Sequence, residues 1–239
     1  MDDERPGLPK WVEEKFRSDL LDELKSSHGL PYEELSLFEW YVRETEKLYD
    51  QMYAEELKFI EDQDPDRPDY NDSGMVPVAY FIKRSRYSHV IHLASLGETV
   101  LSHACWKLTK ALGKNIIFGL KEISGQNWTR ERKFIERYGN FDIPDELWNR
   151  LSQIYLVRNA LVHDNGAIDA FTEDDRKKIR KKYADAPGIG VEGYEIQIEP
   201  EFVSFGLQTL KEFTAYLTEK LSVVIDWSVK PRSVPLNPV

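Results

Sequence analysis

The sequence predicts a mainly α-helical fold with at most a short strand or hairpin near residues 189–198. Apolar residues recur at intervals of three and four along most of the chain, which is the spacing of one face of a helix. Glycine and proline stand between these stretches, at the places where helices end. The alternation that is typical of a strand is clear at Tyr194, Ile196 and Ile198. Helices therefore dominate the predicted structure.

The first third of the chain predicts two helices and a linker. An early helix begins near Pro9 and breaks at residues 29–31, and its apolar face consists of Trp11, Phe16, Leu20, Leu21 and Leu24. A long helix follows over residues 32–60, with apolar residues at helical spacing: Phe38, Tyr41, Leu48, Met52 and Phe59. Residues 62–77 contain three prolines and a glycine among Asp and Asn residues, so we expect a loop or linker there.

The remaining elements follow from residue 83 onward. A helix over 83–112 ends at Gly113, residues 115–123 predict a short helix or a strand, and another helix covers 129–138. Pro144 begins a helix that runs to His163, and the Asp-Asn-Gly sequence after it is typical of a turn. Thr172 caps a further helix. Residues 186–193 are expected as a loop, and Pro200 opens a final helix to residue 227.

The acidic residues are concentrated near the start of the chain. Residues 1–72 contain 9 Lys and Arg against 22 Asp and Glu, whereas residues 73–239 contain 23 against 20. We therefore predict three parts, which are an acidic N-terminal helical segment over 1–72, a helical domain over 73–228 and a loose C-terminal tail over 229–239. The net charge of −10 opposes nucleic-acid binding on average, but the predicted domain does not share that excess.

The sequence also indicates a cellular compartment. Cys105 is the only cysteine, which excludes an intramolecular disulfide and fits a reducing environment. The residues after Met1 include no apolar run of the kind found in a secretory signal. No stretch approaches the roughly 18 apolar residues that a membrane span needs. We expect a cytoplasmic protein without a membrane partner.

A short motif near the end of the helix over 144–163 contains residue types that suit RNA cleavage. In the sequence Arg-Asn-Ala-Leu-Val-His, Asn159 and His163 are four residues apart and face the same way. Arg158 is about 140° round the helix axis from His163, so the two converge only if the arginine wraps back or the helix bends. An imidazole moves protons near neutral pH, and a guanidinium binds phosphate oxygens in pairs. Asn159 can fix the local backbone, and this chemistry requires no metal or other cofactor.

This motif resembles the Arg-x4-6-His signature of the HEPN superfamily, and the resemblance extends over roughly residues 78–228. It implies a helical bundle that forms a homodimer, in which two Arg/His pairs share one cleft. It also implies a metal-independent endoribonuclease, often part of a toxin–antitoxin or anti-phage system. Arg158 and His163 correspond to the catalytic pair, with Asn159 in support. We expect attack by the ribose 2'-OH to leave a 2',3'-cyclic phosphate.

Other interpretations of the motif stay open. A non-catalytic HEPN-like module would bind RNA, a nucleotide or a protein partner such as an antitoxin or regulatory protein through the same cleft. In a helical interaction protein the motif would be incidental, with Arg158 in an ion pair and His163 capping the helix C-terminus. Detection of the cyclic phosphate would separate the endoribonuclease from both alternatives.

Further candidate residues flank the motif in the sequence. Glu98 lies in the apolar stripe of the helix over 83–112, and a buried carboxylate needs a partner, for which Arg158 is a candidate. A basic run is expected to hold RNA phosphates or to form a solvated helix face: Arg176, Lys177, Lys178, Arg180, Lys181 and Lys182. His92 and His103 are eleven residues apart, about 16 Å along a helix, which is too far to share one metal ion.

Overall fold

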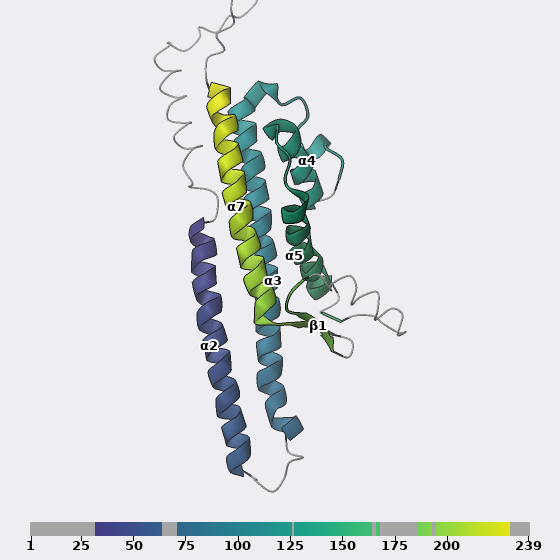
Figure 1. The fold of residues 1–239 in the computed structure, drawn as a ribbon. Coiled ribbons are helices and arrows are strands. Elements are labelled where there is room, and N and C mark those ends of the chain that lie inside the picture. Colours follow the sequence, from purple (N-terminus) through teal and green to yellow (C-terminus); the bar gives the residue numbers. More distant parts are fainter. Residues whose placement is uncertain are drawn as a thin grey trace, which may run out of the picture. The chain divides into compact units, whose positions relative to one another are not determined.

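The computed structural model describes residues 32–63, 71–125, 127–163, 166–167, 186–192 and 195–229. Most of these residues lie in helices, as Figure 1 shows. The helices are α2 (Tyr32–Gln63), α3 (Asn71–Leu112), α4 (Asn127–Gly139), α5 (Asp145–His163) and α7 (Pro200–Val229). The strands are β1 (Ile189–Glu192) and β2 (Glu195–Ile198). The predicted mainly α-helical fold, with one short hairpin near 189–198, is confirmed.

The described chain divides into two compact units. One unit contains residues 32–98 and 144–213, and the other contains residues 99–143 and 214–229. The first unit includes α2, the N-terminal part of α3, α5, the hairpin and the start of α7. The second includes the end of α3, α4 and the rest of α7. The domain boundaries expected from charge at residues 72 and 228 stay a prediction.

The first unit is built on helices that bury apolar residues at helical spacing. Its core side chains include Leu35, Phe38, Leu93, Ile154, Phe202 and Leu210. Gly206 allows α7 to approach α3 closely, because a Cβ at this position would lie 2.7 Å from Leu93 Cδ1 and 3.6 Å from Ile154 Cδ1. A salt bridge of 2.6 Å between Lys211 and Glu39 connects α7 to α2. Apolar burial on one stripe of each helix therefore explains the packing of this unit.

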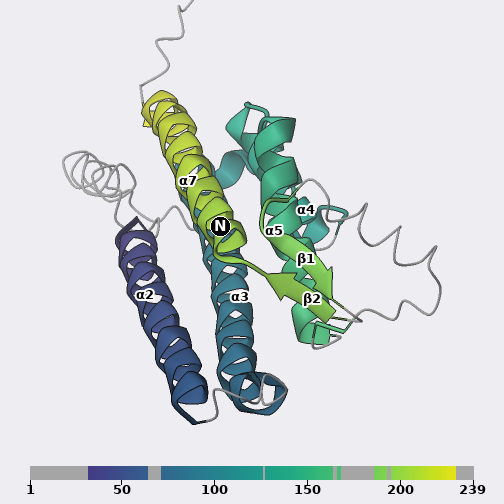
Figure 2. The ribbon, with the colours of Figure 1, turned by 60° about the horizontal axis from the view of Figure 1, so that its bottom comes forward.

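The hairpin of β1 and β2 belongs to the same unit. The strands are antiparallel and pair Ile189 with Ile198 at one end and Glu192 with Glu195 at the other. Ile196 and Ile198 are buried, whereas Glu195 and Gln197 between them are half-buried, which is the alternation of a strand with one face inward. Figure 2 shows this hairpin beside α3 and α5. A two-stranded hairpin alone is marginal in water, so these helices stabilise it.

The second unit has its own buried residues and polar contacts. Phe134 and Ile135 of α4 are buried, as are Leu101 and Leu108 of α3. Ser102 donates a hydrogen bond of 3.0 Å to the carboxylate of Glu131, which joins α3 to α4. The short 3-10 helices η2 (Gly113–Asn115) and η3 (Leu120–Glu122) lie between these two helices in the chain.

Three local predictions were wrong. Residues 71–77 of the expected linker form the start of helix α3. The low helix propensity of Gly74 and Pro77 is outweighed because extending a long helix that has already formed is cooperative. Residues 115–123 form neither one helix nor a strand. The amide of Phe118 donates a hydrogen bond to the hydroxyl of Tyr138, and this hydroxyl donates to the carbonyl of Phe118, so the main chain there bonds to a side chain instead. The expected loop over 186–193 contains strand β1, which pairs with β2.

Several predictions fall on residues that the structure does not describe. They are the helix near residues 9–28, the helix after Thr172 and the tail after residue 229. The other predicted helices, over 32–60, 83–112, 129–138, 144–163 and 200–227, are confirmed with shifts at their ends. None of the helices in the described part of the chain contains an apolar stretch long enough to span a membrane.

Candidate functional site

Helix α5 presents the candidate motif on its last two turns. Its first turn contains Asp145 and Glu146, whose negative charge suits a helix N-terminus. One face of the helix is buried, and the opposite face therefore points outward. The buried residues are Leu147, Leu151, Ile154, Val157 and Leu161. The helix ends at His163, which is exposed. The buried stripe therefore determines which side of the motif reaches solvent.

The structure records one direct contact within the motif. Nη1 of Arg158 donates a hydrogen bond of 3.0 Å to Oδ1 of Asn159. Both side chains are half-buried. Asn159 and His163 are four residues apart on α5 and share a face, so this bond holds the guanidinium beside a side chain on the face of His163. The arginine thus lies against Asn159, and no hydrogen bond or ion pair joins it to His163 in the described part of the chain, so the approach of Arg158 to His163 stays a prediction.

Glu98 lies on α3 and is half-buried. Among the described residues, no ion pair joins Glu98 to Arg158, whose recorded partner is the Asn159 side chain. The pairing of Glu98 with Arg158 is thus not seen in the structure. The six candidate RNA-binding residues from Arg176 to Lys182 lie outside the described residues.

Gly166 fixes the chain just after His163. Its φ of +75° lies in the left-handed region, which glycine adopts without strain. Its amide donates to the carbonyl of Ala160 at 3.2 Å, and its own carbonyl accepts from the amide of Ile196 at 2.9 Å. Ala167 then forms an isolated bridge with Glu195. The end of α5 is therefore joined directly to strand β2.

Tyr87 of α3 closes the other side of this turn. A Cβ added at Gly166 would lie 2.6 Å from the Tyr87 hydroxyl oxygen, so only glycine fits there without movement. The same hydroxyl donates a hydrogen bond of 2.5 Å to the carbonyl of Ile196. Burial, with the charge of Glu195 as a further cause, raises the pKa of Tyr87 to about 12, so the hydroxyl keeps its proton near neutral pH. Tyr87, Gly166 and Ile196 together position the motif end of α5.

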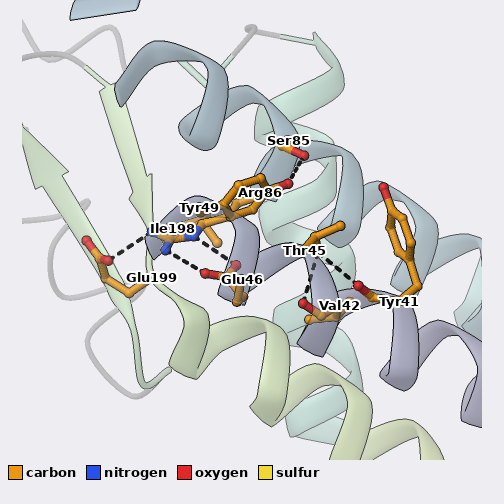
Figure 3. A network of polar contacts seen from close by, with 9 residues as sticks. All are labelled: Tyr41, Val42, Thr45, Glu46, Tyr49, Ser85, Arg86, Ile198 and Glu199. Carbon is orange, nitrogen blue, oxygen red and sulfur yellow. Dashed lines mark hydrogen bonds and ion pairs between the residues drawn. The ribbon is translucent and has the colours of Figure 1, made fainter. Parts of the chain in front are cut away.

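Charged residues on α3 also contact the hairpin through ion pairs and hydrogen bonds. Arg86 donates to both carboxylate oxygens of Glu46 on α2, at 3.1 and 2.7 Å, and to the carboxylate of Glu199 at 3.2 Å (Figure 3). Lys83 forms an ion pair with Glu195. The hydrogen bond and charge of Lys83 lower the pKa of Glu195 against the opposing effect of burial. These contacts therefore join α3 to both ends of β2, and Arg86 also joins α3 to α2.

The structure raises the pKa of Arg86 above its ordinary value. Burial acts to lower this pKa, but the hydrogen bond and charge of Glu46, together with the charge of Glu199, outweigh the effect of burial. Arg86 therefore stays charged across the working range of pH. The hydroxyls of Tyr49 and Ser85 form a hydrogen bond next to this group, which further ties α2 to α3 (Figure 3).

Sequence reasoning did not identify this supporting group. Lys83, Arg86 and Tyr87 occur at positions i, i+3 and i+4, which places them on one helix face. Glu195 lies within the predicted strand and Glu199 follows it directly, and both carry the charge opposite to that of Lys83 and Arg86. That charge pattern was the available signal, but the sequence does not reveal that the strand lies against this helix face.

The described residues contain no group of three His, Cys, Asp or Glu side chains arranged to hold a metal ion. His89 and His92 lie near each other on α3, where their rings contact Phe38 of α2. Comparison with protein-family models, with curated proteins and with solved structures found no significant match.

Proposed function

We propose that this protein is a metal-independent endoribonuclease of HEPN type, whose reaction centre is Arg158 and His163. The supporting observation is the hydrogen bond from Arg158 to Asn159 in the last turns of α5, which turns the guanidinium toward a residue on the same helix face as His163. A phosphate next to these two groups meets a cation with paired donors and a proton-transfer group.

The proposed reaction uses the substrate's own 2'-OH as the nucleophile. His163 takes the proton from the 2'-OH or gives one to the leaving 5' oxygen, and Arg158 binds the non-bridging oxygens as their charge grows. The P–O bond to the 2' oxygen forms while the bond to the 5' oxygen breaks, which leaves a 2',3'-cyclic phosphate. Asn159 orients Arg158 through their hydrogen bond.

The biological setting follows from the same proposal. We place the protein in the cytoplasm, as a toxin or anti-phage effector that acts as a homodimer on RNA. An antitoxin or another regulatory protein would then control its activity. The basic residues from Arg176 to Lys182 would contribute phosphate contacts that weaken as the salt concentration rises.

The test is incubation of purified protein with total RNA in excess EDTA, followed by analysis of the RNA ends. We expect cleavage with cyclic-phosphate ends by the wild type, and loss of at least about a hundredfold in rate for His163→Ala and Arg158→Ala. His92→Ala and Arg43→Ala serve as matched controls, because both residues are exposed and lie on other helices. Cleavage that persists in His163→Ala would refute the assignment. Folded wild-type protein that binds RNA without cleaving it would identify a binding module instead.

A further inference from the structure

Helix α2 carries an unusual share of the exposed apolar surface. Of the fourteen large apolar side chains that are exposed in the described part of the chain, seven lie on this one helix: Leu37, Trp40, Tyr41, Leu48, Tyr53, Leu57 and Phe59. Five of them lie on the side of α2 that faces away from its buried residues Leu35, Phe38, Val42 and Tyr49, whereas Tyr53 and Leu57 lie on the same side as those buried residues. Concentrated exposed apolar area of this kind marks an interaction surface.

Four of these exposed residues form a strip along the helix axis. At about 100° per residue, Leu37, Tyr41, Leu48 and Phe59 fall within an arc of about 40°. Widening the arc to about 80° adds several acidic residues and no Lys or Arg of α2. We call this strip the outer face of α2, and it comprises Glu34, Leu37, Tyr41, Glu44, Leu48, Met52, Glu55, Phe59 and Asp62.

A groove of about 670 Å³ adjoins the outer face at the N-terminal half of α2. Leu37, Trp40 and Tyr41 line it from α2, and Ser88, His89 and His92 line it from α3. Trp40 and Leu37 are 53% and 65% exposed, so large apolar side chains border the groove on the solvent side. Its size suits a few bulky apolar side chains of a partner.

His89 gives the groove an uncharged wall. The side chain is 2% exposed, and its ring centroid lies 5.9 Å from that of Phe38 and 5.5 Å from that of Tyr41. Neither ring nitrogen has a hydrogen-bond partner among the described residues. Burial lowers the pKa of His89 against the opposing charge of Glu46, with Arg86 and His92 acting in the same direction as burial, so the neutral imidazole is favoured at pH 7. The wall at His89 therefore favours apolar contact, and the negative charge in the lining of the groove comes from Glu34.

We propose that the outer face of α2 and the adjoining groove bind a basic amphipathic helix of a partner protein. The apolar strip supplies the hydrophobic contact, and the groove accepts the partner's largest apolar side chains. The acidic residues Glu34, Glu55 and Asp62 pair with Lys or Arg on the flanks of the partner helix, whereas Glu44 already forms ion pairs with Arg43 and Lys47. Phe59 lies 22 residues after Leu37, so the strip is about 33 Å long, which matches a partner helix of about 20 residues.

The charge of α2 argues against two other occupants. The helix contains ten Asp and Glu against three Lys and Arg, so RNA phosphates would be repelled from it. A symmetric contact with a second copy would place the acidic strip against itself, with no base on the strip to compensate. A basic helix avoids both conflicts. This inference is independent of RNA cleavage at Arg158 and His163.

The test uses synthetic peptides and the full-length chain. The probe is a labelled 20-residue helix with Leu on one face and Lys on the flanks. One comparison peptide has Glu in place of Lys, and another has the same composition in a scrambled order. Fluorescence anisotropy at physiological salt measures binding, and light scattering measures the molar mass of the protein alone.

Two pairs of variants separate the apolar and the charged contributions. Leu37→Ser with Tyr41→Ser removes apolar contact, and Ile117→Ser is the control because Ile117 is 79% exposed on another segment. Glu34→Lys with Glu55→Lys reverses charge on the strip, and Glu219→Lys is the control on α7. Circular dichroism verifies that each variant is folded.

Of the three peptides, we expect only the basic one to bind the wild type. Its dissociation constant should be at least about tenfold larger for each double variant and nearly unchanged for the control variants. The charge-reversed protein should also gain affinity for the acidic peptide. Equal binding of the scrambled peptide, or equal binding by the variants, would overturn the proposal, since it would indicate unspecific attraction to an acidic protein. A dimer that Leu37→Ser with Tyr41→Ser converts to a monomer would overturn it in favour of self-association.

Discussion

The hydroxyl of Tyr87 donates a hydrogen bond of 2.5 Å to the main-chain carbonyl of Ile196, which joins helix α3 to strand β2. Both residues are buried. The amide of Ile196 in turn donates to the carbonyl of Gly166, three residues after His163. The candidate motif at the end of α5 is therefore positioned by a helix and a strand that are distant from it in sequence.

Tyr87→Phe should lower the free energy of unfolding by about 1–2 kcal/mol, because it leaves the buried carbonyl of Ile196 without its side-chain donor. Tyr216→Phe is a matched control, since the hydroxyl of Tyr216 also bonds to a main-chain carbonyl, that of Asp142, but at an exposed site. Water can replace that bond, so the loss there should be about 0.5 kcal/mol or less. Urea denaturation measures both values, and equal losses would contradict the structural role of Tyr87.

Tyr87 should also contribute to alkaline unfolding. Its pKa is raised from 10.0 to about 12 by burial and by the charge of Glu195. The unfolded chain releases this proton at lower pH than the folded chain, so the contribution of Tyr87 to stability is complete below pH 10 and is lost as pH rises toward 12. Comparison of wild type with Tyr87→Phe across this range should show a steeper fall for the wild type. Parallel curves would contradict the raised pKa.

Gly166→Ala should destabilise the protein by about 2 kcal/mol or more. The residue has φ of +75°, and the added Cβ would lie 2.6 Å from the Tyr87 hydroxyl oxygen. Gly113→Ala separates conformational strain from steric conflict, because Gly113 has φ of +50° with nothing within 4 Å of the added Cβ. The expected cost there is about 1 kcal/mol. Thermal unfolding of the two variants provides the comparison, and a ranking in the opposite order would refute the tight contact at Gly166.

Arg86→Ala should cost about 3 kcal/mol, because it leaves the largely buried carboxylate of Glu46 without its partner. The side chains of Arg86 and Glu46 are 16% and 18% exposed. Arg43→Ala is the control at the exposed pair with Glu44, where the expected change is about 0.5 kcal/mol or less. Chemical denaturation measures both. Equal losses in the free energy of unfolding for the two variants would contradict the proposed stabilising role of Arg86.

His89 should make the protein less stable in mild acid. Burial is the main cause of its lowered pKa, so the unfolded chain binds the proton more readily than the folded chain. Stability should therefore decrease as pH falls below 6.5, the ordinary value, until pH reaches the lower pKa of the folded state. The melting temperature of the His89→Phe variant should decrease less with falling pH than that of the wild type. His163→Ala is the control at an exposed histidine.

The sequence by itself determined the helices and the location of the motif. The apolar spacing predicted α2, α4, α5 and α7 closely, because each of these helices buries one stripe of regularly spaced residues. The alternation at Ile196 and Ile198 predicted the strand β2. Arg158, Asn159 and His163 were identifiable because their chemistry and spacing are properties of a single helix.

Only the tertiary structure decided what surrounds the motif and which surfaces stay exposed. The extension of α3 through Pro77 and the irregular chain near Phe118 depend on helix cooperativity and on the Tyr138 hydroxyl, which no local pattern encodes. The contact of Tyr87 with Gly166 joins residues almost eighty positions apart in the chain. Local spacing determines which face of a helix is apolar, but only the packing of distant segments decides which of those faces is covered.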